Sequence, residues 1–235
     1  METRAATWES AALAAEAASP GRTAPGDAQA LEAIMREHNQ RLYRLALGLV
    51  GDTNDAEDVL QDAYVRAFER RASFAGRSGI GAWLASIVRN QAIDHLRSRR
   101  ARHSAYRLES ELPFVADELE SPIQKAPDRA LDGDPELEVD REQVRVALES
   151  AIAVLPSPFR SVFMLREIEG LSLQQTAIYL GIPIATVKTR AHRARLLLRA
   201  ELGADFEGYA HRTFLFLGER CDRIVARVLA RLARA

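Results

Sequence analysis

The sequence predicts an all-α protein in which two small helical domains are joined by an acidic, flexible linker. Three observations lead to this fold class. Ala, Leu and Arg dominate the 235 residues and aromatic residues reach only 6%, a composition that favours helices over sheets. Apolar residues recur at helical spacing in two separate blocks. Between the blocks lies a stretch rich in proline and acidic residues, which is typical of an interdomain linker.

The chain is predicted to have five segments. Residues 1–28 are expected to form a flexible tail, because prolines and glycines interrupt an Ala-rich stretch of little periodicity. The other four segments are a first helical domain over 29–103, the acidic linker over 104–135, a second helical domain over 136–203, and a C-terminal amphipathic extension over 204–235.

Three helices are expected in the first domain. The first helix has apolar residues at helical spacing from Leu31 to Leu49 and stops at Gly51. Asn54 is a good N-cap for the second helix, and Glu57 three positions later indicates a capping box. One stripe of this second helix is apolar, with Leu60, Ala63, Tyr64, Ala67 and Phe68, and the residues expected to face elsewhere are Asp55, Asp58, Gln61, Asp62 and Arg66.

A glycine-rich loop and a third helix complete the first domain. The loop spans Phe74 to Gly81. The third helix runs from about Ala82 to Arg102, and the residues it is expected to bury are Trp83, Leu84, Ile87, Val88, Ile93 and Leu96. Trp83 is assigned to the core, with a stacking platform for a base as the alternative.

The second domain contains a predicted helix-turn-helix. Helices resume near Pro135, and two prolines at 156 and 158 punctuate them. Ser172 caps a short helix over 173–180, Gly181 makes the turn, and Pro183 precedes a longer helix. The residues placed to close a small core are Ala177, Leu180, Ile182, Val187 and Ala191. A generic helical hairpin is the alternative.

Charge is distributed unevenly along a chain whose formal net charge is only −1. A basic block spans Arg89 to Arg107, acidic residues prevail from Glu109 to Asp140, and a second basic block spans Lys188 to Arg199. Two basic blocks separated by an acidic one indicate two contacts with polyanions. The longer helix of the helix-turn-helix can enter a DNA major groove, with a merely solvated charged face as the alternative.

Several classes of protein are not supported by the sequence. It has no phosphate-binding loop, no HExxH motif and no metal-ligand spacing of Cys and His, so no metal site, no cofactor and no enzymatic activity are expected. The single Cys221 excludes an internal disulfide and fits a reducing cytoplasm. No apolar run approaches the roughly 20 residues of a membrane span, so membrane insertion is not expected.

Residues 30–102 and 136–202 together resemble the bacterial sigma factors of the extracytoplasmic-function (ECF) group, which keep only the second and fourth conserved regions of larger sigma factors. Three stretches carry the resemblance: DAEDVLQDAYVRAFER from Asp55, AWLASIVRNQAIDHLRSRR from Ala82, and LPSPFRSVFMLREIEGLS from Leu155 with the helix-turn-helix after it. They look like the polymerase-binding helix, the minus-ten recognition helix and the minus-thirty-five reader of that family.

The resemblance implies a function, partners and site residues. The chain is expected to bind core RNA polymerase, at the clamp helices of the largest subunit and the flap of the second largest, and to direct promoter-specific initiation at a stress or envelope-response regulon. The implied polymerase-binding residues are Asp58, Gln61 and Asp62. Those implied at the minus-ten element are Phe74, Arg77, Ser78, Arg89, Asn90, Asp94, Arg97, Arg99 and Arg100. The four arginines at 89, 97, 99 and 100 are implied to contact DNA phosphates. Those implied at the minus-thirty-five element are Thr186, Lys188, Thr189, Arg190, His192 and Arg193.

The chain also departs from the family pattern. Ile80 and Gly81 stand where the family more often has an aromatic or basic residue, and Gln174 and Gln175 replace paired acids. The acidic linker is expected either to lie in the RNA exit path of polymerase or to be a plain tether. The C-terminal extension is expected to pack on the second domain, with regulator binding and DNA contact as alternatives. Two alternatives also stay open. An anti-sigma protein could restrain the chain, and the chain as a whole could be an autonomous helix-turn-helix regulator.

Overall fold

The computed structural model describes residues 25–74, 79–109, 136–202 and 218–234. Within these ranges all regular structure is helical and no strand occurs, which confirms the predicted all-α class. The elements in chain order are α2 (Pro25–Val50), α3 (Thr53–Glu69), η1 (Arg71–Ser73), α4 (Ile80–Glu109), α5 (Glu136–Val154), α6 (Ser157–Phe163), η2 (Met164–Ile168), α7 (Leu173–Leu180), α8 (Ile184–Leu202) and α9 (Gly218–Leu232). The predicted positions Arg77 and Ser78 and most of the linker lie outside these ranges.

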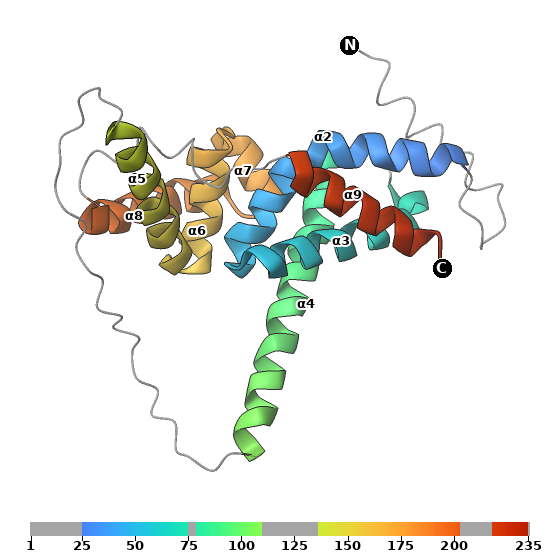
Figure 1. Ribbon diagram of the computed structural model, residues 1–235, viewed down its shortest axis with the longest axis horizontal. Coiled ribbons are helices and arrows are strands. Elements are labelled where there is room, and N and C mark those ends of the chain that lie inside the picture. The colour runs from blue at the N-terminus through green and yellow to red at the C-terminus, as the bar shows by residue number, and fades with distance from the viewer. Residues whose placement is uncertain (1–24, 75–78, 110–135, 203–217, 235) are drawn as a thin grey trace.

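Helices α2, α3 and α4 form the first domain, and α5 to α8 form the second (Figure 1). The first core is built from large side chains that are no more than 2% exposed, among them Tyr43, Leu60, Tyr64 and Leu84. The C-terminal half of α4 extends away from both domains (Figure 1). The predicted stop of the first helix is confirmed, because Gly51 has a φ of +85° and its N–H donates to Leu47 O at 2.9 Å.

Two predicted helix starts are wrong, each for a local reason. Helix α2 begins at Pro25, inside the predicted tail, since proline at a helix start has a preset φ and no N–H to satisfy. The N-cap of α3 is Asp52 instead of Asn54, and its carboxylate accepts from the backbone N–H groups of residues 54 and 55 at 2.8 and 2.9 Å. Helix α4 begins at Ile80, close to the predicted start near Ala82, but it continues to Glu109, six residues into the predicted linker.

The predicted stripe of α3 is buried as expected, but two other burial predictions are wrong. Gln61 was expected to face away from the core, yet it is only 5% exposed. Ile93 was expected to be buried, yet it is 40% exposed. Trp83 is half-buried, and its ring packs on Phe74 with 5.2 Å between centroids.

The helix-turn-helix prediction is confirmed in its details. Ser172 caps α7 in a capping box, with its hydroxyl accepting from Gln175 N and the Gln175 side chain accepting from Ser172 N. Gly181 adopts a left-handed φ of +63° at the turn. Four of the five predicted core residues are buried, namely Ala177, Leu180, Val187 and Ala191, and Ile182 is half-buried.

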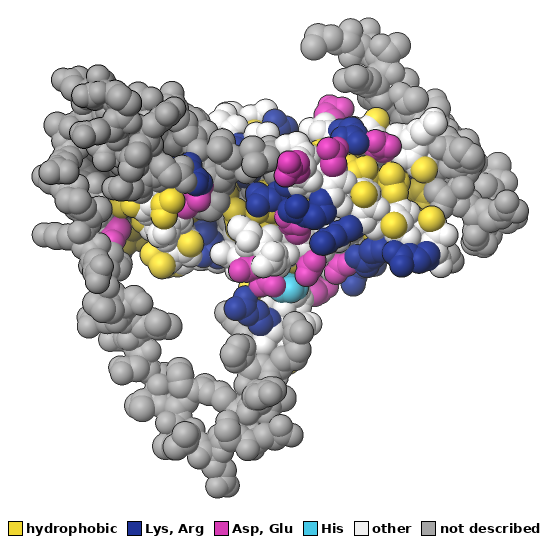
Figure 2. Space-filling view, in the orientation of Figure 1, with side chains coloured by type: hydrophobic (Ala, Val, Ile, Leu, Met, Phe, Trp, Pro, Cys, Tyr) yellow, Lys and Arg dark blue, Asp and Glu magenta, His cyan; other side chains and the backbone are white. Residues whose placement is uncertain are grey.

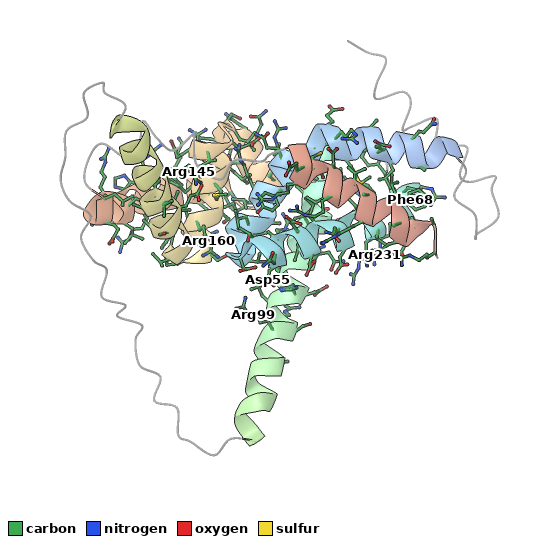
Figure 3. All side chains as sticks on the ribbon, viewed as in Figure 1. Asp55, Phe68, Arg99, Arg145, Arg160 and Arg231 are labelled. Carbon is green, nitrogen blue, oxygen red and sulfur yellow. The ribbon has the colours of Figure 1, made fainter. Side chains whose placement is uncertain are left out.

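The two domains pack directly on one another and share a continuous core. Arg160 of α6 lies at this junction (Figure 3), and its guanidinium donates to the carbonyls of Gly48 at 3.0 Å and Leu49 at 3.3 Å at the end of α2. It also donates to Ala153 and Leu155 within its own domain. Burial lowers the pKa of Arg160. One arginine thereby satisfies carbonyls at helix ends from both domains.

The amphipathic C-terminal helix is confirmed, but its predicted packing partner is wrong. Helix α9 lies along α2 and α3 of the first domain (Figure 1), and the residues it buries are Ile224, Val225 and Val228. Residues 214–217, which the sequence also assigns to the apolar face, lie outside the described ranges.

Candidate functional site

Helix α3 exposes part of the acidic face that the resemblance assigns to polymerase. Asp58 and Asp62 lie one turn apart and are both exposed. Asp62 accepts from Arg231 of α9 at 2.7 Å, and both side chains are about half-exposed, at 50% and 45%. Gln61, which lies between the two acids in the sequence, is buried, and its Nε2 has no hydrogen-bond partner. Among the three predicted residues, Asp58 is therefore the one that is exposed and takes no part in the ion pairs with α9.

Glu57 is a charged residue of this surface that sequence reasoning assigned only to a capping box. Its side chain is 9% exposed and accepts from Arg220 at 3.1 Å and from Arg223 at 3.0 Å. Burial alone would raise the pKa of Glu57, but the two guanidinium groups outweigh it and hold the pKa below its usual value. The partners are more than 160 residues away in sequence, so no local pattern indicates them.

Helix α4 presents the predicted minus-ten residues unevenly. Asn90 and Asp94 are exposed one turn apart, as predicted. Arg97 and Arg99 are also exposed, and Arg99 donates to Asp55 of α3 at 2.8 Å (Figure 3). The side chain of residue 100 lies outside the described part of the structure.

Arg89 is not on this exposed surface, and its role on DNA phosphates stays a prediction. It is half-buried, and its guanidinium donates to Tyr179 O of α7 at 3.5 Å. At the start of α4, a Cβ added to Gly81 would lie 2.6 Å from the Tyr179 hydroxyl. In this packed arrangement a larger side chain at this position would require the Tyr179 hydroxyl to move.

Helix α8 presents a cationic outer face. Lys188, Thr189, His192 and Arg193 are exposed, and Thr186 and Arg190 are half-buried. The opposite face is anchored by buried residues at three- and four-residue spacing, namely Val187, Ala191, Ala194 and Leu198. Arg195 beside them donates to Glu167 of η2 at 2.6 Å, which fixes the helix on its domain. The predicted set is therefore brought together on one side of a single helix.

Neither a metal-binding cluster nor a membrane-spanning helix is present in the described ranges. No group of three or more His, Cys, Asp and Glu side chains there is arranged to hold a metal ion. None of the helices there combines the length and apolar character that crossing a bilayer requires.

Comparisons with known proteins agree on one family. Residues 34–102 match Sigma-70 region 2, and residues 145–198 match Sigma-70, region 4. The ECF RNA polymerase sigma factor SigW of Bacillus subtilis is 32% identical over 177 residues, which cover 75% of this chain and 91% of that protein. The ECF sigma factor SigE of Mycolicibacterium smegmatis is 34% identical over 179 residues, covering 75% and 64%. Helix α9 lies outside both matched regions.

A solved structure has a similar fold. The sigma factor RpoE from Bartonella quintana, solved in complex with the anti-sigma factor NepR, aligns with a TM-score of 0.52 and 26% identity over 74% of this chain and 96% of that chain. Two matched regions in the family's order, on α2 to α4 and on α5 to α8, and relatives matched over most of their length show that this chain belongs to the bacterial RNA polymerase sigma factors of the ECF group.

Proposed function

We propose that this sigma factor divides its work among three helices: α3 binds core RNA polymerase, α4 recognises the minus-ten element, and α8 recognises the minus-thirty-five element. What supports this most is the separation of exposed charge. Helix α3 exposes Asp58 and Asp62, whereas α8 exposes Lys188 and Arg193. Acids steer one surface toward a basic protein, and cations steer the other toward phosphates.

The proposed role of α8 follows from its shape and its side chains. A helix fits the major groove of B-DNA, where Arg and Lys reach guanine edges and phosphates. The buried side of α8 holds it on the domain, so the residues near its N-terminus can point into the groove. Arg190 and Arg193 are the best placed for base contacts, with Lys188 on phosphate.

The proposed role of α4 combines polar and cationic groups. Asn90 and Asp94 offer hydrogen-bonding groups on one exposed face, and Arg97 and Arg99 offer charge for the backbone. The base captured from the melted strand is assigned to the segment before α4, which includes Phe74, Arg77 and Ser78. Prising out a base costs a few kcal/mol, which stacking in a pocket can offset.

The two domains must part for both elements to be read together. The elements are centred about 25 base pairs apart, or roughly 85 Å along the duplex at 3.4 Å per base pair. A compact body of this size has a radius of gyration of about 17 Å and is therefore only roughly 45 Å across. We therefore propose that binding to polymerase separates the domains and frees Arg89, which then reaches DNA phosphate.

We further propose a role as a non-catalytic specificity subunit in the bacterial cytoplasm, acting on a stress or envelope-response regulon. Run-off transcription on a genomic library with core polymerase, followed by mapping of the RNA 5′ ends, would identify the promoters. New start sites upstream of genes unrelated to stress or the envelope would contradict the regulon.

Asp58→Arg is the sharpest test of the polymerase-binding face. Asp62 is less suitable, because its loss would also break the ion pair with Arg231. We expect Asp58→Arg to weaken binding to purified core polymerase at least about tenfold, since like charges then meet across the interface. Fluorescence anisotropy of the labelled full-length chain measures this affinity.

Glu37→Arg is the matched control, because Glu37 is an exposed acid on α2 and the charge change is the same. It should leave the affinity for core polymerase unchanged. Equal affinities of the wild type, Asp58→Arg and Glu37→Arg would contradict the assignment of α3.

Arg193→Ala tests the minus-thirty-five reader within holoenzyme. If Arg193 makes a bidentate base contact, initiation should lose about 1 to 3 kcal/mol of preference at one upstream position. Abortive initiation on templates with single substitutions in that element measures the preference. A loss that is equal on all templates would indicate a phosphate contact instead.

A further inference from the structure

Helix α9 covers the same side of α3 that the proposed function assigns to polymerase. It carries four arginines and two acids, and three of the arginines pair with acids of α3. Arg220 and Arg223 bind Glu57, and Arg231 binds Asp62 at 2.7 Å. In Figure 2 the blue and magenta side chains lie together along the strip where α9 crosses the first domain, and Figure 3 places Arg231 at the α3 side of α9.

Apolar contacts also dock α9 on the first domain. Ile224, Val225 and Val228 are at most 4% exposed in the structure. The guanidinium of Arg220 lies 4.7 Å from the centre of the Tyr43 ring. At the other side of the helix Asp222 accepts from Arg36 of α2 at 2.7 Å. Helix α9 therefore bridges α2 and α3 and does not lie loosely on the surface.

Not every polar group in the part of the first domain that α9 covers is satisfied. Three buried polar atoms of the first domain, Asn39 Oδ1, Gln61 Nε2 and Tyr64 Oη, have no hydrogen-bond partner. The amide nitrogen of Asn39 donates to Cys221 Sγ of α9 at 3.1 Å, so Asn39 borders the docked helix. A buried polar atom without a partner at this contact, Asn39 Oδ1, subtracts from the stability of the docked arrangement.

We propose that α9 is an intramolecular competitor of core RNA polymerase, a basic amphipathic helix that occupies the acidic face of α3 until polymerase displaces it. This inference rests on the proposed role of α3. The arginines of α9 supply the charge that a basic partner would supply, to Asp62 of the proposed polymerase-binding face and to its neighbour Glu57. While α9 is docked, Glu57 is enclosed and Asp62 is engaged, and only Asp58 of the predicted trio is open to a partner.

The double variant Arg223→Glu with Arg231→Glu tests the competition in the full-length chain. Both side chains are about half-exposed, at 44% and 45%, so reversing them should repel α9 from α3 without disturbing the core of the first domain. If docking leaves about a tenth of the molecules open, releasing α9 should tighten binding to core polymerase about tenfold. Arg227→Glu is the matched control, because Arg227 is exposed on the same helix and forms none of these ion pairs.

A second variant, Val228→Glu, releases α9 by a different route. Val228 is 0% exposed, and a carboxylate there cannot stay buried without a partner. Hydrogen exchange should show lost protection in α9 and retained protection in α3 for both variants, which verifies release without unfolding. Both variants should bind core polymerase more tightly than the wild type, and Arg227→Glu should bind like the wild type.

The outcomes separate this inference from the proposed function. If α9 is released and the affinity is unchanged or weaker, α9 does not compete with polymerase, and the inference is overturned while the role of α3 stands. If α9 keeps its protection in both variants, the ion pairs and Val228 do not hold it, and the inference is also overturned. If no form of the chain binds core polymerase, the proposed function itself is wrong.

Discussion

Ion pairs of a buried carboxylate connect the two domains. Glu169, at the end of η2, accepts from Arg44 of α2 at 2.7 Å, and the two side chains are only 8% and 7% exposed. Arg41 also donates to Glu169, at 3.2 Å. A carboxylate in such surroundings is stable only with its partners, and removing it leaves a guanidinium buried without compensation.

We expect Glu169→Ala to lower the free energy of unfolding by about 3 kcal/mol or more, because Arg44 would stay buried without its partner. Glu149→Ala is the matched control. Glu149 pairs with Arg145 one turn away on α5, and both side chains are more exposed, at 25% and 29%. Its loss should cost no more than about 0.5 kcal/mol. Urea unfolding measures both values, and a small loss for Glu169→Ala would contradict the importance of this pair.

At the scale of elements, the close crossing of α2 and α6 sets the distance between the domains. A Cβ added to Gly48 would lie 2.8 Å from the backbone Cα of Ser161. The hydroxyl of Ser157, at the start of α6, donates to Leu49 O at 2.9 Å beside this crossing. The missing side chain at Gly48 therefore allows two helix backbones to touch.

Gly48→Ala sets two effects against each other. Alanine in a helix interior gains about 1 kcal/mol over glycine, but the new methyl group must push against backbone, and overpacking costs about 1 to 3 kcal/mol. We expect the clash to win and the melting temperature to fall. Gly218→Ala, where nothing lies within 4 Å of the added Cβ, should not lower it. Scanning calorimetry measures the two melting temperatures. A higher melting temperature for Gly48→Ala would mean that the helices can move apart freely.

At the scale of the whole molecule, His38 lies where three helices of the two domains meet. A Cβ placed on Gly81 of α4 would be 3.4 Å from the His38 ring and 2.6 Å from the hydroxyl of Tyr179 on α7. Burial lowers the pKa of His38, and the charge of Arg41 adds to this, while Glu37 opposes it. The folded molecule therefore prefers the neutral imidazole.

This preference gives a pH dependence with a definite sign. The unfolded chain binds the His38 proton near pH 6.5, and the folded chain does so only at lower pH, so the stabilisation is complete above pH 6.5 and is lost as the pH falls below it. We expect the urea midpoint to fall between pH 7.5 and 5.5, and His38→Gln to reduce that fall. His192→Gln, at an exposed site on α8, should leave it unchanged. An equal fall in the wild type and His38→Gln would rule out His38 as the cause.

The sequence by itself determined the helical class and the helix-turn-helix with its cap at Ser172 and its turn at Gly181. It could do so because helix periodicity, capping and turn conformation depend on residues within about four positions of each other. Its errors at Pro25 and Asn54 were also local, since competing start signals lay a few residues apart.

Only the tertiary structure decided which charges are open to a partner. It buried Gln61, turned Arg89 toward Tyr179, and moved α9 from the expected second domain onto α3. The ion pairs that place α9 join residues more than 160 positions apart, such as Glu57 and Arg223. The sequence of an amphipathic helix indicates that it packs on an apolar surface with opposite charges beside it. Which surface it covers depends on the shapes that the rest of the folded chain presents.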